Sequence, residues 1–351
     1  MLQFNIEKTS VWEFLQNSEQ PVIMYGTGNG ADKVFEVFHK LNIKVTGVTA
    51  SDGFVRERNF HGFRVTPISE FLEKYEKFIV IITFGSSRPE VIENIKKIAK
   101  KQTVLVPCVP VIGNEIFDRN FLTENEENLN KAYSLLADEK SKEVFKNYVN
   151  FEFSGKLDYL FNMESDISDA FNDYFQLSEN ESFIDIGAYR GDTVEQFLKL
   201  TNGKYNNILA IEPDRKTYKK LVENCKYLMN FEAMNGAVTC TDGMVEFSSV
   251  AGRQSSIGSG IETPSFTLDK LSEKFVPTYI KIDAEGAEID ILNGGKKIIS
   301  EFKPKIKIAT YHKNRDIFEI PILLNEFNKD YKIYMCHHPY IPAWDTDFYC
   351  V

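Results

Sequence analysis

The sequence predicts an α/β protein with two Rossmann-like units joined by a helical segment. The same pattern occurs twice: an apolar run leads into a glycine turn, at Gly26 and again at Gly187, and a helical pattern follows. The segment between these two patterns has helical spacing throughout. With 351 residues the chain is long for one hydrophobic core, so two domains are expected.

Residues 1–113 are expected to form a smaller Rossmann-like, nucleotide-binding-like domain. Three apolar runs indicate buried parallel strands: 21–25, 44–49 and 78–84. The turn Gly26-x-Gly28-x-x-Ala31 is a degenerate dinucleotide fingerprint, because Ala replaces its third glycine. The acidic residue that should follow the second strand comes late, at Asp52. We therefore favour a structural or nucleotide-sugar-binding role for this domain over catalytic use of NAD.

Residues 114–180 are expected to form a helical connector. Three stretches have helical spacing with charged and polar faces: 124–137, 141–148 and 165–174. We expect this connector to pack on the domain that follows it and to cover that domain's site.

Residues 181–351 are expected to form a second, larger α/β domain. The first expected strand of this domain ends at Asp185. The other expected strands lie at 208–211, 231–233, 279–283, 305–311, 332–336 and 347–350. Asp242-Gly243 predicts a hairpin turn between 238–240 and 245–247. We expect the helix over 317–327 to be interrupted at Pro321. The short final strands predict an antiparallel edge on a mostly parallel sheet.

The turn after the first strand of this domain differs from a dinucleotide turn. Asp185-x-Gly187-x-x-x-Gly191 has a carboxylate at the strand tip, where it would repel a pyrophosphate. A carboxylate there suits a cationic ligand, and S-adenosylmethionine carries both an ammonium and a sulfonium group. The plainer alternative is a tight turn with no ligand. Asp192, with Glu195 three positions on, is expected to cap the following helix first and to meet a ligand second.

Five successive strands of this domain end in polar residues: Asp185, Glu212, Asn235, Asp283 and His312. Ligands of open α/β sheets bind beyond the carboxyl ends of the strands, so these side chains are expected to share one site. Glu212 lies where a carboxylate can accept both ribose hydroxyls of an adenosine. Together with Asp185 it predicts an adenosine cofactor.

Composition limits the possible partners. The chain has 41 basic and 51 acidic residues and a net charge of −10, which disfavours binding to nucleic acid or an anionic membrane. The five cysteines form no C-x-x-C pair, so we expect reduced thiols rather than a zinc site. Neither a signal peptide nor a membrane span is recognisable. We expect a soluble cytoplasmic protein with a small-molecule or glycan acceptor, and homo-oligomer formation is left open.

Several motifs, taken in order, resemble the FkbM-type S-adenosylmethionine-dependent methyltransferases. They are Asp185-Ile186-Gly187-Ala188-Tyr189-Arg190-Gly191-Asp192-Thr193, Ile211-Glu212-Pro213-Asp214, Thr267-Leu268-Asp269, Lys281-Ile282-Asp283-Ala284-Glu285-Gly286-Ala287-Glu288 and Tyr311-His312. The resemblance covers roughly residues 120–351, and the segment from Lys281 to Glu288 is its most specific part. It implies a seven-stranded class I methyltransferase fold and methyl transfer to a hydroxyl of a sugar or natural product. The N-terminal domain resembles units attached to sugar-modifying enzymes.

We assign the expected site residues accordingly. The S-adenosylmethionine site is expected to comprise Asp185, Gly187, Ala188, Tyr189, Gly191, Asp192, Thr193, Glu212, Pro213, Asn235, Gly236 and Asp283. The substrate side is expected to comprise Tyr174, Gln254, Ser255, Glu285 and His338. A sugar hydroxyl has a high pKa, so a base should accelerate the transfer by about 10²–10⁴. His312 is the first candidate, and Asp283 is an alternative base or a substrate anchor.

Alternatives to these assignments remain open. The carboxylates near Asp283 and the ring of His312 could bind a divalent metal, but acidic residues also favour a helix start, and no metal is predicted. Lys281 shares a strand face with Asp283, which predicts a buried ion pair. The rival functions are an NAD-dependent sugar-nucleotide oxidoreductase or epimerase using the Gly26 turn, and a non-catalytic nucleotide-sugar-binding module. No N-P-P-Y motif of amine methylation is present.

Overall fold

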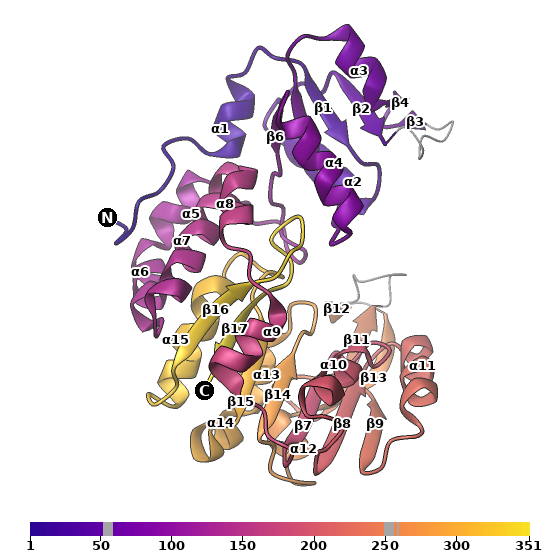
Figure 1. Ribbon diagram of the computed structural model, residues 1–351, viewed down its shortest axis with the longest axis vertical. Coiled ribbons are helices and arrows are strands. Elements are labelled where there is room, and N and C mark those ends of the chain that lie inside the picture. Colours follow the sequence, from indigo (N-terminus) through magenta and orange to yellow (C-terminus); the bar gives the residue numbers. More distant parts are fainter. Residues whose placement is uncertain (52–58, 249–255, 258–259) are drawn as a thin grey trace.

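The computed structural model describes residues 1–51, 59–248, 256–257 and 260–351. The chain forms an N-terminal α/β domain, a group of connecting helices and a C-terminal α/β domain (Figure 1). Asp52, Gln254 and Ser255, which the sequence analysis singled out, lie outside the described residues.

The N-terminal domain contains a six-stranded sheet with strand order β3-β4-β2-β1-β5-β6. The strands are β1 (Val22–Tyr25), β2 (Gly47–Ala50), β3 (Asn59–Phe60), β4 (Phe63–Pro67), β5 (Ile79–Ile82) and β6 (Thr103–Leu105). Every residue of β1 and β5 is buried, because helices cover both faces of these parallel strands. The helices are α1 (Val11–Gln16), α2 (Asn29–Lys40), α3 (Ile68–Lys74) and α4 (Pro89–Ala99).

The connector is helical, as predicted. It comprises α5 (Arg119–Glu124), α6 (Glu126–Leu135), α7 (Glu139–Ser154), α8 (Leu157–Asn162), α9 (Ile167–Ala170) and the π-helix η2 (Phe171–Phe175). The second half of α7, from Asn147 to Ser154, is buried on all sides. Helix α7 packs against strand β16 and α6 packs against helix α15, so the connector lies against the following domain, as expected.

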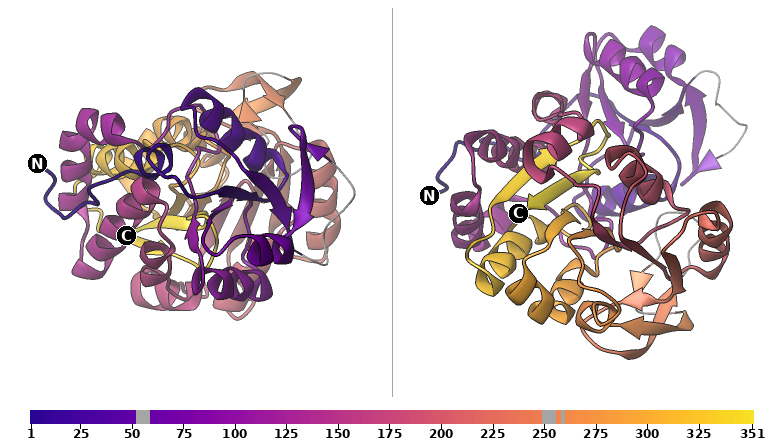
Figure 2. Two further views of the ribbon diagram at one scale, coloured as in Figure 1. Left: turned by 90° about the horizontal axis from the view of Figure 1, so that it is seen from above. Right: turned by 60° about the horizontal axis from the view of Figure 1, so that its bottom comes forward.

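The C-terminal domain contains a seven-stranded sheet with strand order β16-β17-β15-β14-β7-β8-β9 (Figure 1). Figure 2 shows the molecule from two further sides. The strands are β7 (Ser182–Ile186), β8 (Asn207–Glu212), β9 (Phe231–Asn235), β14 (Tyr279–Ile282), β15 (Lys305–Ala309), β16 (Ile333–His337) and β17 (Thr346–Cys350). All pairings are parallel except those of β17, which is antiparallel to both neighbours. This confirms the predicted fold class, including its antiparallel edge.

Helices cover this sheet on both faces. They are α10 (Asp192–Leu200), α11 (Arg215–Cys225), α12 (Leu268–Leu271), α13 (Glu288–Gly294), α14 (Lys296–Phe302) and α15 (Asp316–Phe327). Helix α15 continues through Pro321, so the predicted interruption is wrong. Ile317, Phe318, Ile320 and Leu324 of this helix are all buried. Their burial outweighs the cost of about 3 kcal/mol for a proline inside a helix.

The predicted hairpin at Asp242-Gly243 is also wrong. A separate four-stranded sheet has the order β10-β13-β11-β12, with β10 (Ala237–Val238), β11 (Gly243–Ser248), β12 (Ser256–Ile257) and β13 (Ile261–Phe266). Strand β13 therefore separates the two strands that the turn was expected to pair. The carboxylate of Asp242 accepts a hydrogen bond of 2.7 Å from the backbone N–H of Thr267. The turn is therefore fixed by a residue that follows β13, not by a partner strand across the turn.

The two α/β domains also meet directly through loops. Ser86, after β5, pairs with Ile341, between β16 and β17, through backbone hydrogen bonds of 2.7 and 3.0 Å. Beside this bridge the ring of Trp344 packs on Gly85, where a Cβ atom would lie 2.5 Å from the ring. The loop between the last two strands is therefore joined to the N-terminal domain.

Gly187, at the end of β7, provides a test of how tightly strands β7 and β14 are packed. A Cβ atom there would lie 1.9 Å from the carbonyl oxygen of Asp283, and its φ is +77°. Gly203 has nearly the same φ, +74°, but has no atom within 4 Å of the added Cβ. We expect Gly203→Ala to cost only the left-handed strain, about 1–2 kcal/mol. Gly187→Ala should cost about 3 kcal/mol more, because backbone must also move. Urea unfolding of both variants measures the difference, and equal losses would contradict this account.

Candidate functional site

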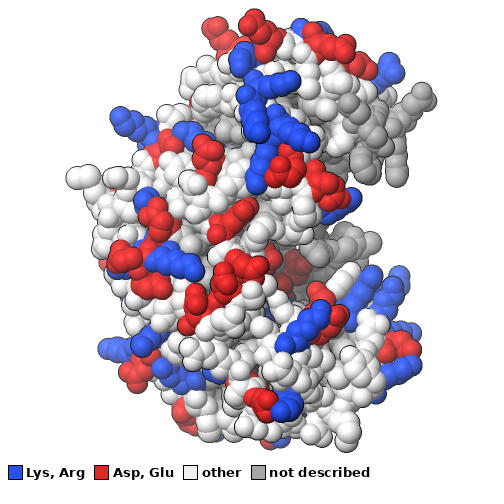
Figure 3. Space-filling view, viewed as in Figure 1, with Lys and Arg blue, Asp and Glu red and all other residues white. Residues whose placement is uncertain are grey.

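The site is a cavity of about 1180 Å³ between the two α/β domains. Its walls include the start of α2 and the carboxyl end of β5 from one domain and the carboxyl ends of β7, β8 and β14 from the other. Figure 3 shows the surface hollowed where the two domains meet, with lysine and arginine side chains along the lower rim. Ligand sites of open α/β sheets lie at such edges.

Glu212 is fixed at the tip of β8 by backbone groups. Its Oε2 accepts the N–H of Tyr189 at 2.9 Å, and its Oε1 accepts the N–H of Asp214 at 2.8 Å. The side chain is 7% exposed and lines the cavity. Burial raises the pKa of Glu212 to about 7, although the two backbone hydrogen bonds oppose this shift. The carboxylate is therefore held in one orientation before a ligand binds.

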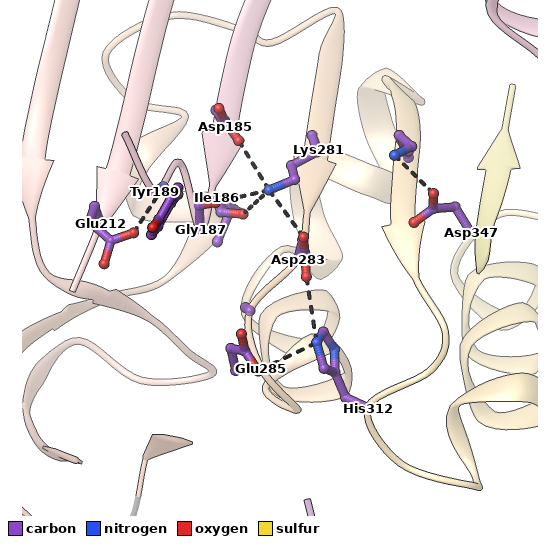
Figure 4. A network of polar contacts seen from close by, with 12 residues as sticks. Asp185, Ile186, Gly187, Tyr189, Glu212, Lys281, Asp283, Glu285, His312 and Asp347 are labelled. Atoms are coloured by element: carbon purple, nitrogen blue, oxygen red, sulfur yellow. Dashed lines mark hydrogen bonds and ion pairs between the residues drawn. The ribbon is translucent and has the colours of Figure 1, made fainter. Parts of the chain in front are cut away.

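Asp185, Lys281 and Asp283 form a row of alternating charge (Figure 4). Lys281 lies opposite Asp185 in the pairing of β14 with β7, so the two side chains share one face of the sheet. The Nζ of Lys281 is 3.5 Å from Asp185 and 3.6 Å from Asp283. It also donates a hydrogen bond of 2.9 Å to the carbonyl of Gly187. The predicted ion pair of Lys281 with Asp283 is confirmed, and Asp185 is a second partner.

The pKa values in this row reflect burial and mutual attraction. Burial raises the pKa of Asp185 to about 6, although Lys281 opposes the shift. Burial alone would raise the pKa of Asp283 too, but the charges of Lys281 and His312 outweigh it and hold that pKa below its usual value. The row carries one net negative charge when both carboxylates are ionised.

His312 is a buried cation. It is 1% exposed, and its Nδ1 lies 2.9 Å from Glu288, while its Nε2 lies 3.5 Å from Asp283 and 3.7 Å from Glu285. Burial alone would lower the pKa of His312, but these carboxylates raise it to about 10. The base role predicted for His312 needs a neutral ring, whereas the neighbouring carboxylates favour the protonated ring. Its charge instead holds the surrounding carboxylates together.

Eight of the twelve expected cofactor residues line the cavity: Gly187, Tyr189, Asp192, Thr193, Glu212, Pro213, Gly236 and Asp283. Asp185, Ala188, Gly191 and Asn235 are not among the lining residues. The carboxylate of Asp185 is fully buried against Lys281 rather than facing a ligand. The side-chain amide of Asn235 donates to the carbonyls of Glu212 and Pro213 and so holds neighbouring strand ends together.

Asp192 differs from its expected role as a helix cap. Helix α10 begins at Asp192 with Gly191 as its N-cap, and Gly191 has a φ of +91°. Gly191 also packs closely, because a Cβ atom there would lie 2.7 Å from the Sγ of Cys225. The carboxylate of Asp192 is therefore in the first helical turn, where it faces the cavity and the positive end of the helix dipole.

Fewer of the expected substrate residues line the cavity. Glu285 lines the cavity, whereas Tyr174 and His338 do not. The ring of Tyr174 stacks on Tyr334 with centroids 4.1 Å apart. His338 is buried with both ring nitrogens engaged, Nδ1 with the Ser165 carbonyl and Nε2 with the Tyr349 hydroxyl. These contacts correct the assignment of both residues to the substrate side. Gln254 and Ser255 are outside the described residues.

Several residues that line the cavity were not predicted from the sequence. Tyr148 and Glu152 of α7 line it, as do Tyr340 and Trp344 of the loop between β16 and β17. One local signal was present, since Glu152 is a single carboxylate between two phenylalanines in a buried stretch of helix. The loop residues carry no such signal, because only tertiary packing brings them to the site.

Close packing against Thr83 requires glycine at two positions of the glycine turn in the N-terminal domain. A Cβ atom at Gly26 would lie 2.6 Å from the Thr83 hydroxyl, and one at Gly30 would lie 2.5 Å from the Thr83 carbonyl. Only Gly28, the N-cap of α2, has open space beside it. Close contact between β1 and β5 thus explains two of these glycines without a bound pyrophosphate.

Within the described residues, no group of three or more His, Cys, Asp or Glu side chains is arranged to hold a metal ion. None of the helices in those same parts of the chain has both the length and the apolar character required to cross a membrane.

This strand order, with a carboxylate-lined cavity at the carboxyl edge of the sheet, defines a class I methyltransferase fold. Residues 185–337 match the family model described as the methyltransferase FkbM domain. The chain therefore contains an FkbM-type methyltransferase domain and is a methyltransferase. The family match supports S-adenosylmethionine as its cofactor.

Solved structures extend the comparison of the fold. The methyltransferase FkbM from Methylobacillus flagellatus KT has a TM-score of 0.72 and 20% identity, covering 99% of this chain and 94% of that one. A precorrin-6y C5,15-methyltransferase from Geobacter metallireducens GS-15 has a TM-score of 0.34 and 10% identity, covering 52% and 84%. Fibrillarin of Aeropyrum pernix, solved with S-adenosylmethionine, has a TM-score of 0.34 and 12% identity, covering 50% and 69%. No curated protein matches the chain. The first comparison shows that the likeness in fold spans both domains.

The raised pKa of His312 gives a stability test. Its folded pKa of about 10 exceeds the unfolded value of about 6.5, so its contribution is full below about pH 6.5 and is lost as pH rises towards 10. We expect His312→Gln to lower the free energy of unfolding by about 3–5 kcal/mol near pH 6. The difference from wild type should shrink as pH approaches 10. Urea unfolding across this range measures it, with exposed His39→Gln as the control. A difference that does not change with pH would contradict the cationic role.

Proposed function

We propose that the protein transfers a methyl group from S-adenosylmethionine to a hydroxyl of a sugar, nucleotide-sugar or glycan-related acceptor. The division of the cavity supports this proposal. Glu212 and the Gly187 turn line one part, aromatic and acidic side chains line another, and Asp283 also faces the cavity.

The first part fits the cofactor. The carboxylate of Glu212 is oriented by two backbone N–H groups and retains lone pairs for the ribose hydroxyls. The row of Asp185, Lys281 and Asp283 leaves a net negative charge beneath the Gly187 turn, which favours a cationic ligand. Glu212, Tyr189 and Asp283 would therefore hold the adenosine and the charged end of the cofactor.

The second part fits a polyhydroxylated acceptor. Its aromatic side chains include Tyr311, Tyr340 and Trp344, and its carboxylates include Glu285 and Asp345. Aromatic faces pack against the C–H groups of a sugar ring, and ionised carboxylates accept hydrogen bonds from its hydroxyls. This composition supports a sugar rather than a purely apolar acceptor.

Asp283 is our candidate for holding the reacting hydroxyl. When bound, S-adenosylmethionine supplies a methyl group on a positively charged sulfur. The side chain of Asp283 is 37% exposed, and its Oδ1 accepts a hydrogen bond of 3.2 Å from the Tyr311 hydroxyl. Its lowered pKa keeps it ionised, so it can orient the acceptor hydroxyl and take its proton as the oxygen–carbon bond forms. His312 stabilises this carboxylate without titrating at neutral pH.

Cofactor binding tests the first part of the proposal. By isothermal titration calorimetry we expect wild-type protein to bind S-adenosylhomocysteine, with affinity rising up to about tenfold from about pH 6 to about pH 8 as Glu212 ionises. Glu212→Gln should weaken binding about tenfold or more at the higher pH and remove most of that rise. The control is Glu223→Gln on the exposed side of α11. Absence of binding to wild type would overturn the cofactor assignment.

Asp283→Asn tests the proposed reaction centre. Transfer of labelled methyl groups from S-adenosylmethionine to a panel of sugars and nucleotide-sugars would first identify an acceptor. We expect Asp283→Asn to lower kcat with that acceptor by about 10² or more, because the amide cannot take the proton. Asp290→Asn, exposed on α13, should leave kcat unchanged. Wild-type kcat in the Asp283 variant would assign that residue to structure alone.

A further inference from the structure

We infer that Glu152, on the connector helix α7, binds the ring hydroxyls of the acceptor. This inference rests on the proposed function, because it identifies a recognition group for the acceptor of that same site. It concerns a residue outside the stretch 185–337 that matches the methyltransferase family.

The position of Glu152 supports this role. Glu152 follows Tyr148 by one helical turn, so both side chains lie on the same face of α7, and both line the cavity. The hydroxyl of Tyr148 lies 3.4 Å from the carbonyl of Thr310, to which it donates. The next residue, Tyr311, donates to Asp283. Tyr148, one helical turn before Glu152, thus contacts the strand end that leads to the proposed reaction centre.

Glu152 also lacks the partner that a buried carboxylate requires. It is 8% exposed, and in the described part of the chain no lysine, arginine or histidine forms an ion pair with it. Its neighbour is the thiol of Cys108, which is a weak hydrogen-bond donor. Burial raises the pKa of Glu152 to about 7. Burying a carboxyl group without a strong partner destabilises a fold, so a ligand that supplies hydrogen-bond donors is the missing partner.

The chemistry of the group selects its ligand. A carboxylate offers two oxygens as acceptors, which matches neighbouring hydroxyls of a sugar ring. The same charge would repel a phosphate, so Glu152 contacts the uncharged ring rather than any phosphate that the acceptor carries. Buried groups that bind hydroxyls discriminate strongly, because a ligand without the hydroxyl leaves them unpaired.

The test compares Glu152→Gln with Glu143→Gln. Glu143 lies on the same helix but is exposed and paired with Lys146. With the acceptor found among neutral monosaccharides and nucleotide-sugars by labelled methyl transfer, we expect Glu152→Gln to raise the acceptor KM about tenfold or more. Its affinity for S-adenosylhomocysteine should stay within about twofold of wild type, because the contact is with the acceptor. Glu143→Gln should behave as wild type in both assays.

Thermal unfolding separates recognition from structure. Removing an unpaired buried charge should leave the Tm of Glu152→Gln equal to or above that of wild type. A clearly lower Tm, or an unchanged KM, would overturn the inference while leaving the proposed function intact. If wild-type protein binds S-adenosylhomocysteine but methylates no sugar in the panel, the acceptor class is wrong and the inference fails with it. If S-adenosylhomocysteine does not bind, the proposed function itself fails.

Discussion

The rest of the site depends on the contacts that the ammonium group of Lys281 makes with two carboxylates and a backbone carbonyl. This group lies between the carboxylates of Asp185 and Asp283 and donates to the carbonyl of Gly187, so it joins β7, β14 and the first turn. Lys281 and Asp185 are buried and Asp283 is partly exposed, and removing Lys281 or Asp185 would leave a buried charge without its partner. The carboxyl edge of the sheet is therefore ordered before a ligand arrives. Methyl transfer requires such order, since the reacting atoms must be aligned.

Some residues that line the cavity come from the stretch that matches the methyltransferase family, and others come from outside it. The stretch 185–337 that matches the methyltransferase family supplies Glu212, the Gly187 turn and Asp283. Much of the opposite wall comes from outside that stretch, including Glu152 on α7 and Trp344 after β16. The part proposed for the acceptor is therefore lined by residues from inside and from outside the matched stretch. The choice of acceptor is therefore expected to depend on these lining residues rather than on the fold.

Local sequence patterns predicted the sheets and the strand tips because those features depend on residues close together in the chain. Glu212 follows directly from its strand, and the pairing of Lys281 with a carboxylate follows from alternation along β14. The orientation of Asp185 could not be predicted, since it depends on the register of β7 with β14, almost a hundred residues apart. The turn at Asp242 was misread for the same reason, because β13 enters between the two strands. Tyr174 and His338 were assigned by position alone, and packing engages them elsewhere.

The bridge between Ser86 and Ile341 ties the position of one wall of the cavity to the N-terminal domain. Two backbone hydrogen bonds and the contact of Trp344 with Gly85 fasten the loop between β16 and β17 to that domain. The same loop lines the part of the cavity that we propose for the acceptor. The packing of the two domains therefore sets where this wall lies relative to the β7 and β8 tips. The width of that part of the cavity thus depends on how the N-terminal domain is packed, whether or not that domain binds a ligand.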